Sequence, residues 1–457
     1  MVFVQVTSKA APSRPPHTAR NHNSAYKPSR SVLCMTGTNT VKSMMRVAVL
    51  MLMLASVMQA QAASRPVFSD TGPDAEAYGA AQGFPVPSPP VAALPTQEFM
   101  VGWHSHYDRF RQMRTVHKAD KPSVLKRAEE EINPVYPYEG RYNFIKDYLE
   151  RNPVTGLLIA RDDTILSEHY RYGRTDEDRF LSESMVKTIT GLLIGIGISE
   201  GAIRSVDDTA ATYVPELAGT EYGATPLRAL LHMASGVTFH ETYEPGDDSL
   251  KLSAALLWPG ATGAVAALKQ FNSREAAPGT RFSYSSADTE VLGLVVSRAV
   301  HMTLADYLST RIWQKLGTEA DAAWAIDPTG QEVAYCCFVA TLRDWARLAL
   351  MLAHDGAWNG QQIVPRQWLL DATSVTAANS FGALSERLGG YGYQLFVLAG
   401  DRRTFLLRGI YGQAILVDPE THLVAVQTAV RLEPTGGPKS LEGGALWYAI
   451  VAQYGHQ

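Results

Sequence analysis

The chain has 457 residues, of which 46% are hydrophobic and 19% charged, a composition that predicts a folded protein with a large core and excludes a disordered or fibrous chain. Residues 1–62 carry seven Lys or Arg and no Asp or Glu, whereas the remaining residues carry 34 basic and 45 acidic side chains, a net charge of −11. An acidic body without a basic stripe argues against a nucleic-acid partner, because phosphate binding needs clustered Lys and Arg.

Residues 44–62, MMRVAVLMLMLASVMQAQA, have the pattern of an export signal. Arg46 gives the stretch a positive start, residues 47–58 are apolar, and Ala-Gln-Ala at 60–62 is a small-residue site that a signal peptidase recognises. Twelve apolar residues are few for a bilayer span, so cleavage is favoured over a short membrane anchor, which remains the alternative. We therefore expect a signal peptide from about Met44 to Ala62 and an exported, periplasmic or secreted protein without a stable membrane anchor.

Residues 63–97 are rich in Pro, Gly and Ala and have no periodicity, which predicts an extended linker or a loosely wrapped arm. Ordered structure is expected from residue 98 to the end of the chain. Residues 155–173 show two β-rich runs around Arg161-Asp162-Asp163, the pattern of a β-hairpin.

Residues 185–198, MVKTITGLLIGIGI, are apolar nearly all round, which predicts a buried helix. Lysine is rarely buried unless it is paired, yet Lys187 lies in this run, three positions after Ser184. Residues at i and i+3 share a helix face, and a desolvated lysine has a lowered pKa, so a neutral amine could accept the serine proton. The unpaired N–H groups at the start of the helix also suit an oxyanion.

The Ser-x-x-Lys pattern is weak by itself, since it also occurs at residues 24–27 and 123–126. On local grounds alone, Ser184 as a helix cap and Lys187 as a side chain that extends to the surface would be the preferred interpretation. Only the match at residues 184–187 lies in apolar surroundings, and these surroundings favour a chemical role.

Residues 200 to about 380 show mainly helical spacing of apolar residues, which predicts a helical subdomain. Within it, residues 278–286, PGTRFSYSS, place Tyr284, Ser285 and Ser286 on a turn before a helix. A tyrosine near a lysine ammonium loses its proton more easily, so Tyr284 could share the base role or protonate a leaving group. The alternative is a capping turn with a half-buried tyrosine.

Cys336 and Cys337 are adjacent in the same region, and the third cysteine, Cys34, precedes the predicted cleavage site. Neighbouring cysteines rarely pair, because the required geometry is strained. We therefore expect two small buried hydrophobic residues at a helix entry, not a disulfide or a metal site.

Three β-rich stretches, at residues 391–400, 404–420 and 422–430, predict a three-stranded meander followed by a closing helix at 443–455. Strands at both ends of the chain predict one mixed sheet completed by the two termini, with the helical subdomain inserted between them. Gly409 interrupts the second stretch. A glycine inside a strand marks either an ordinary bulge or a close backbone approach, at which a main-chain N–H could complete an oxyanion hole.

Taken in order with LLHMASGV at residues 230–237, these motifs resemble the serine β-lactamase-related hydrolases over residues 135–455. That group includes class C β-lactamases, D-alanyl-D-alanine carboxypeptidases, esterases and the 6-aminohexanoate-dimer hydrolases. The resemblance implies a mixed α/β fold of the β-lactamase/transpeptidase type, with an antiparallel sheet flanked by helices, over residues 98–457. It also implies a serine acyl-enzyme mechanism that needs no metal or cofactor.

By position, the resemblance makes Ser184 the nucleophile, Lys187 the activating base and Tyr284 the acid/base partner. The oxyanion hole would use the backbone N–H of Ser184 and that of Gly409 or Ile410.

Two departures from the group bear on the substrate. Its β-lactamases carry Tyr-x-Asn, where this chain ends the motif in Ser286, and Lys-Thr-Gly or His-x-Gly, where this chain has LRGIYG at 407–412. Efficient β-lactam hydrolysis is therefore not expected. The variants are closer to the nylon-oligomer hydrolase branch, in which a tyrosine after the Ser-Gly turn contacts the substrate amide. Tyr243 is the candidate for that contact, and a surface-loop tyrosine is the alternative.

The sequence holds no His-Glu-x-x-His motif, phosphate loop or spaced Cys/His set. We expect an exported serine hydrolase that cleaves an amide or ester bond in a small molecule or short peptide. The alternatives are a D,D-peptidase of the penicillin-binding type and a non-catalytic sensor of the same fold that only becomes acylated.

Overall fold

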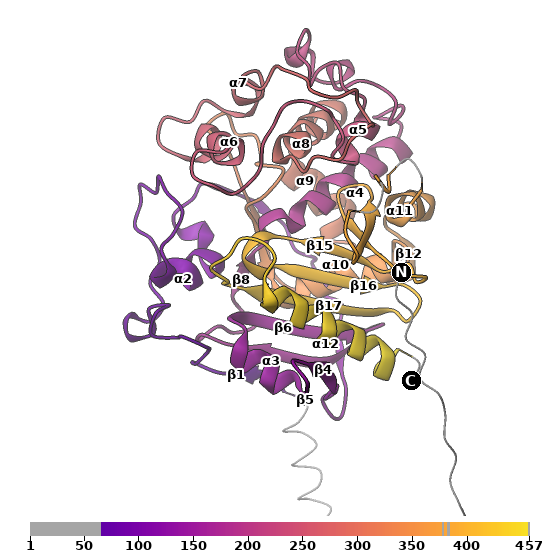
Figure 1. Cartoon of the computed structure of the whole chain (residues 1–457). Coiled ribbons are helices and arrows are strands. Elements are labelled where there is room, and N and C mark those ends of the chain that lie inside the picture. Colours follow the sequence, from indigo (N-terminus) through magenta and orange to yellow (C-terminus); the bar gives the residue numbers. More distant parts are fainter. Residues whose placement is uncertain (1–64, 377–378, 382–383, 456–457) are drawn as a thin grey trace, which may run out of the picture. The chain divides into compact units, whose positions relative to one another are not determined.

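The computed structural model describes residues 65–376, 379–381 and 384–455, which belong to the unit Met58–Gln457 (Figure 1). The predicted signal peptide, from about Met44 to Ala62, lies outside the described residues.

A nine-stranded sheet forms the centre of this unit. Its order is β1-β7-β6-β17-β16-β15-β14-β13, with β3 also beside β7. The neighbours pair antiparallel, except that β1 and β3 run parallel to β7. The bounds are β1 Val67–Phe68, β3 Lys126–Arg127, β6 Val154–Arg161, β7 Thr164–Tyr170, β13 Leu388–Tyr391, β14 Phe396–Leu398, β15 Phe405–Arg408, β16 Ala414–Asp418 and β17 Leu423–Ala429. Since β6 pairs with β17, the predicted sheet built from both ends of the chain is confirmed.

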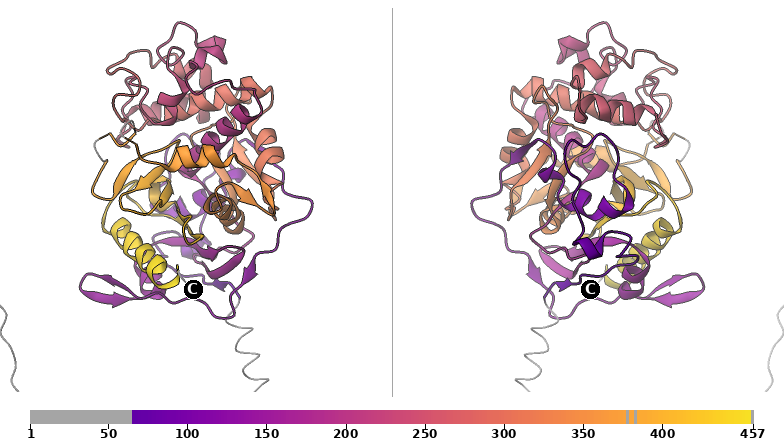
Figure 2. Two further views of the ribbon diagram at one scale, coloured as in Figure 1. Left: turned by 90° about the vertical axis from the view of Figure 1, so that its right-hand side faces the viewer. Right: turned by 90° about the vertical axis from the view of Figure 1, so that its left-hand side faces the viewer.

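The hairpin expected within residues 155–173 is formed by β6 and β7. Asp162 occupies its turn with a φ of 53°. Strand β6 is apolar on both faces, because helices cover the sheet on both sides. Leu158 and Ala160 pack in the same core cluster as helix α10, whereas Leu157 and Ile159 pack with helices α3 and α12 (Figures 1 and 2).

The helices cover the sheet and form the region above it in Figure 1. Their bounds are α2 Met100–Ser105, α3 Ile145–Arg151, α4 Val186–Ser199, α5 Leu227–Leu231, α6 Asp248–Leu257, α7 Ala264–Leu268, α8 Ser286–Val300, α9 Leu304–Leu308, α10 Leu342–Ala353, α11 Arg366–Thr373 and α12 Pro438–Tyr454. A π-helical turn, Ser309–Trp313, follows α9 directly. The expected buried helix is confirmed as α4, which is buried from Val186 to Gly197.

The helical subdomain is smaller than the expected residues 200–380. That range contains strands β9 (Ala322–Ala325) and β10 (Phe338–Thr341), which join β2 (Met113–Val116) and β8 (Arg179–Leu181) in a second sheet of order β2-β9-β10-β8. Helix α10 packs on the main sheet and so also lies outside the subdomain. Both strands have four residues and are fully buried, so their sequences show no alternation that predicts a strand. Two short hairpins complete the strands, β4 Tyr136–Tyr138 with β5 Arg141–Asn143 and β11 Ala357–Trp358 with β12 Gln361–Gln362.

The C-terminal meander has five strands, not the predicted three. The stretch 404–420 divides into β15 and β16, which pair antiparallel, so Gly409 lies at a chain reversal and not inside a strand. Tyr411 and Gly412 both have positive φ, 60° and 97°, in this reversal. Because both flanking runs are apolar, their pattern could not distinguish one interrupted strand from two strands joined by a short turn.

The first strand of the described residues, β1, starts at Val67, earlier than the expected residue 98. Strand β1 pairs with β7, and the buried rings of Tyr78 and Phe84 both pack edge-on against Tyr172. Figure 2 (right) shows this N-terminal arm, residues 65–110, packed in indigo along one side of the unit. Isolated buried aromatic residues such as these have no periodic spacing, so the sequence pattern of the segment favours a linker.

Among the described residues, no single helix has the length and apolar content of a membrane span. The bent helix pair Ser286–Val300 and Leu304–Trp313 has the length and apolar composition of a span only when the two helices are taken together. Its first helix, α8, is buried inside the protein from Ser286 to Ser297.

Gly195 of helix α4 lies against the indole of Trp368, and a Cβ at this position would overlap that ring. We expect Gly195→Ala to lower the free energy of unfolding by about 1–3 kcal/mol, as overpacking does in other cores. Gly197→Ala is the matched control, since its Cβ would meet only the end of the Ile203 side chain, at 3.1 Å. Urea unfolding measures both variants, and equal stability of the two would contradict the contact.

Candidate active site

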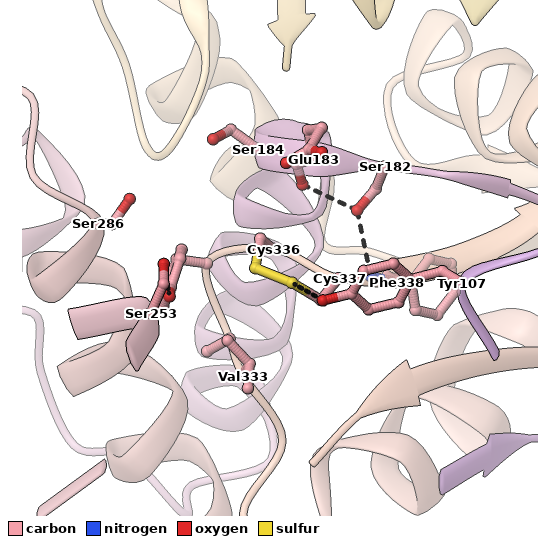
Figure 3. The surroundings of a disulfide bond; sticks show 12 residues. Tyr107, Ser182, Glu183, Ser184, Ser253, Ser286, Val333, Cys336, Cys337 and Phe338 are labelled. Atoms are coloured by element: carbon pink, nitrogen blue, oxygen red, sulfur yellow. Dashed lines mark hydrogen bonds between the residues drawn. A yellow bond between two sulfur atoms is a disulfide. The ribbon is translucent and has the colours of Figure 1, made fainter. Parts of the chain in front are cut away.

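Ser184 stands on a strand-to-helix turn. Strand β8 ends at Leu181, a single 3-10 turn covers Glu183–Met185, and α4 starts at Val186. Ser182 fastens the turn to β10, since its hydroxyl donates to the Glu183 carbonyl at 2.8 Å and accepts from the Phe338 N–H at 3.3 Å (Figure 3). Glu183 has a left-handed φ of 43°, a conformation that costs free energy in a non-glycine residue. The serine is therefore held in a strained turn and is partly exposed.

Lys187 is fully buried beside this serine. Its Nζ donates to Ser184 Oγ at 2.8 Å, to the Tyr335 carbonyl at 3.0 Å and to Ser286 Oγ at 3.1 Å. Desolvation lowers the pKa of the amine to about 8, although the carboxylates of Glu241, Glu183 and Glu290 act in the opposite direction. The structure thus brings together the pair predicted from the sequence, with an amine that can lose its proton near neutral pH.

Tyr284 lies near the amine. Lys187 Nζ is 5.1 Å from the centre of the Tyr284 ring, so the phenol stands beside the Ser184/Lys187 pair. Burial, followed by the negative charge of Glu241, raises the pKa of Tyr284 above its ordinary value. The expectation that the lysine would lower this pKa was wrong, because burial of the phenol and the charge of Glu241 outweigh the opposing charge of Arg408. Tyr284 is therefore a protonated donor at neutral pH, which suits an acid better than a base.

The LLHMASGV motif, residues 230–237, supports the Tyr284 turn. The Met233 carbonyl accepts from the Ser283 N–H at 2.8 Å, and Ser235 Oγ donates to Asp288 of α8 at 2.8 Å. Burial raises the pKa of Asp288 to about 7. The motif therefore acts through the position of Tyr284.

Glu241 is a residue of the site that sequence reasoning missed. Its carboxylate accepts from the Ser286 N–H at 2.7 Å, from Ser286 Oγ at 3.1 Å and from the Tyr243 hydroxyl at 3.0 Å. Ser286 thereby connects Lys187 to a carboxylate. Glu241 lies in a loop without a motif, so nothing in the sequence pointed to it.

Tyr243 is brought to the same place and is half-buried. It lines the cleft in which Ser184 and Ser286 lie, and its backbone N–H donates to Asp247 at 2.7 Å with a left-handed φ of 63°. The phenol can reach a group bound in this cleft by exchanging its hydrogen bond to Glu241.

Two backbone N–H groups are placed for an oxyanion. Gly409 is not one of them, since its N–H donates to the Gln413 carbonyl at 2.9 Å. The Gly409 backbone lies close to that of Ser182, since a Cβ on Gly409 would be 2.7 Å from the Ser182 carbonyl oxygen. Ser184 and Ile410 both line the cleft, so their backbone N–H groups are the candidate pair for the oxyanion.

The cleft around Ser184 has a volume of about 100 Å³. Apolar side chains of α6 and its following turn, Leu250, Leu257 and Trp258, form one wall. The N-terminal arm contributes four further lining residues that the sequence did not indicate: Leu94, Pro95, Trp103 and Tyr107.

Cys336 and Cys337 form a disulfide in this cleft, so the expectation that they would not pair was wrong (Figure 3). Both are buried, as expected, but they precede strand β10 and not a helix. Cys337 has a left-handed φ of 71°, and the Tyr107 hydroxyl donates to its Sγ at 3.5 Å. The general rule against adjacent pairs failed because the chain turns sharply here, directly after the Tyr335 carbonyl that accepts from Lys187.

A second serine pattern, Gly-x-Ser-x-Gly at residues 197–201, is not a competing site. Ser199 is exposed at the end of α4, and its hydroxyl donates to the Ile196 carbonyl at 2.8 Å. It lacks the strand-to-helix turn that a nucleophile of this type needs.

Comparisons with known proteins identify the family of the chain. A family model described as beta-lactamase matches residues 143–442. The curated 6-aminohexanoate-dimer hydrolase of Paenarthrobacter ureafaciens is 29% identical over 301 residues, covering 64% of this chain and 76% of that protein.

Two solved structures show the same fold. A putative 6-aminohexanoate-dimer hydrolase from Bacillus anthracis has a TM-score of 0.73 and 24% identity over 82% of this chain and 100% of its own. EstCE1, a hydrolase with promiscuous acyltransferase activity, has a TM-score of 0.55 and 16% identity over 67% of this chain and 96% of its own.

The pKa of Lys187 gives a pH prediction. If neutral Lys187 is the base, the rate of Ser184 acylation by a fluorophosphonate rises about tenfold per pH unit below 8 and levels off above it. Because Glu241 raises this pKa, Glu241→Gln should move the midpoint to lower pH. Glu244→Gln, at an exposed neighbouring residue, is the control and should leave the midpoint in place. A rate independent of pH between 6 and 9 would contradict the assignment.

Proposed function

The chain belongs to the beta-lactamase family and is a serine hydrolase of that family, and from this premise we propose that it cleaves an amide bond through an acyl-enzyme on Ser184. The observation that carries the proposal is the buried Lys187, whose Nζ lies 2.8 Å from Ser184 Oγ and whose pKa is lowered to about 8. An ester could react by the same steps, since its carbonyl is attacked in the same way.

Acylation begins when neutral Lys187 accepts the proton of Ser184 and Oγ attacks the carbonyl carbon. The oxyanion that forms is stabilised by the N–H groups of Ser184 and Ile410. Tyr284 donates its proton to the leaving amine, and the lysine ammonium returns a proton to the phenolate. Water then attacks the acyl-enzyme, with Lys187 and Tyr284 again moving the proton, and the acid product leaves.

A short amide with a flexible methylene chain is the substrate class that we propose. A relative that shares 29% of its residues is named a 6-aminohexanoate-dimer hydrolase. In support, the cleft has apolar walls for methylene groups, and the Tyr243 hydroxyl lies among its lining residues as a donor for an amide. Ser286 in place of the amide side chain of β-lactamases agrees with a substrate other than a β-lactam.

The test is the mass of the protein after treatment with a fluorophosphonate. We expect one adduct on Ser184 that is absent from Ser184→Ala. In Lys187→Ala the acylation rate should fall by a factor on the order of 10³ or more, because the base is lost. Circular dichroism checks that both variants fold. An adduct that persists in Ser184→Ala, or a wild-type rate in Lys187→Ala, would overturn the mechanism.

The same wild-type protein distinguishes the alternatives. Multiple turnovers with release of 6-aminohexanoate from its linear dimer are expected. Release of D-alanine from a D-Ala-D-Ala peptide in preference would instead make the chain a D,D-peptidase, and acylation without turnover would make it a sensor.

We also propose export, on the basis of the signal-like residues 44–62. The disulfide Cys336–Cys337 supports it, since disulfides persist mainly in oxidising compartments. When the full chain is expressed in a bacterium, the protein recovered from the periplasm or medium should start near residue 63. A cytosolic protein with an intact N-terminus, as determined by mass spectrometry, would contradict export.

A further inference from the structure

Asp162, His354 and His422 converge at the end of the main sheet opposite to the cleft. Asp162 occupies the turn between β6 and β7, His422 the turn between β16 and β17, and His354 directly follows α10. Strand β16 starts beside the Gly412 reversal at the cleft and ends at Asp418, so the turn that holds His422 lies at its other end. The cluster therefore belongs to no part of the site around Ser184.

One carboxylate oxygen faces two ring nitrogens in this cluster. Asp162 Oδ1 lies 2.7 Å from His422 Nδ1 and 3.3 Å from His354 Nε2. The two imidazole rings are packed with their centres 3.9 Å apart, and one ligand atom of each of the three residues lies within 4.8 Å of the others.

We propose that Asp162, His354 and His422 form a binding site for a divalent transition-metal ion of the zinc type. Imidazole nitrogens and a carboxylate oxygen are ligands that Zn²⁺ takes at about 2.0–2.2 Å, which puts tetrahedral ligand atoms roughly 3.3–3.5 Å apart. The Asp162–His354 separation of 3.3 Å already has this spacing, and the Asp162–His422 separation of 2.7 Å is shorter by less than 1 Å. All three side chains are partly exposed, so water can fill the fourth position.

The neighbouring charges favour a cation at Asp162 over the adjacent carboxylates of Asp163 and Asp355. Asp163 pairs with Lys126 at 2.8 Å, and Asp355 pairs with Arg403 at 2.5 Å and with Arg366 at 3.4 Å. These carboxylates are therefore neutralised, whereas Asp162 has only the two imidazoles as ionic partners among the described residues. Two protonated rings packed this closely would repel each other, but one metal ion satisfies both nitrogens and the carboxylate together.

The ion would tie two turns of the sheet to the end of α10, and its role would be structural. Binding to the folded state alone raises the melting temperature by mass action, on the order of 3 °C or more at saturating metal. Acylation of Ser184 should not depend on the ion, because the site lies at the opposite end of the sheet.

The experiment measures Zn²⁺ binding to untagged, chelator-treated protein by isothermal titration calorimetry and elemental analysis. We expect one ion per chain and a rise in melting temperature. The variants Asp162→Asn and His422→Asn remove a ligand but keep a residue that tolerates the left-handed φ of 53° or 54° at these positions. His354→Gln removes the third ligand, and each variant should weaken binding on the order of 100-fold or more.

His117→Ala is the matched control, an exposed histidine outside the cluster, and should bind Zn²⁺ like the wild type. Zn²⁺ binding that is absent from the wild type, or that persists unchanged in folded His354→Gln and His422→Asn, would overturn the proposal. If one variant fails to fold, the other two decide, because the three ligands come from separate elements. Fluorophosphonate acylation with and without metal shows whether Ser184 functions independently, so failure of this site leaves the hydrolase mechanism untouched.

Discussion

The buried ammonium of Lys187 is the constraint on which the site depends. A lysine without contact to water needs acceptors for its protons, and here they come from three regions: Ser184 at the start of α4, Ser286 at the start of α8, and the Tyr335 carbonyl before β10. Ser184 follows β8 and Tyr335 precedes β10, both of the second sheet, whereas Ser286 starts α8, so the second sheet and the helical subdomain must be assembled before the amine is satisfied. The same burial that requires these contacts also lowers the pKa of the amine toward neutrality. Burial of Lys187 therefore causes both its need for hydrogen-bond acceptors and its lowered pKa.

The close approach at Gly409 fixes the other side of the cleft. With no side chain, this residue lies against the Ser182 carbonyl, which places the reversal between β15 and β16 next to the turn of Ser184. Its own N–H donates to the Gln413 carbonyl within the reversal, and the neighbouring Ile410 lines the cleft. The sequence pattern left a bulge and a close approach open and placed Gly409 inside a strand, whereas the structure places it at a reversal, close to the Ser182 carbonyl.

Features encoded by local pattern were predicted well. The apolar run of α4, the β6–β7 hairpin and the Ser184/Lys187 spacing follow from periodicity and helix geometry, and the structure places all three as expected. Features that depend on distant contacts were not predicted. Glu241 reaches Ser286 from a loop without a motif, and the pKa of Tyr284 follows from burial that a single stretch of sequence does not report. The disulfide Cys336–Cys337 depends on a left-handed backbone at Cys337, which no residue type at that point announces.

The N-terminal arm belongs to the functional unit of this protein, because it lines part of the cleft. The family model starts at residue 143, yet Leu94, Pro95, Trp103 and Tyr107 form part of the cleft wall. The segment matched by the family model thus contains Ser184, Lys187 and Tyr284, while a segment outside it lines part of the same cleft. The residues that the family model matches and the residues that line the cleft therefore do not span the same part of the chain. Diversification of such a hydrolase can therefore proceed by changing its preceding segment while the reacting groups are left as they are.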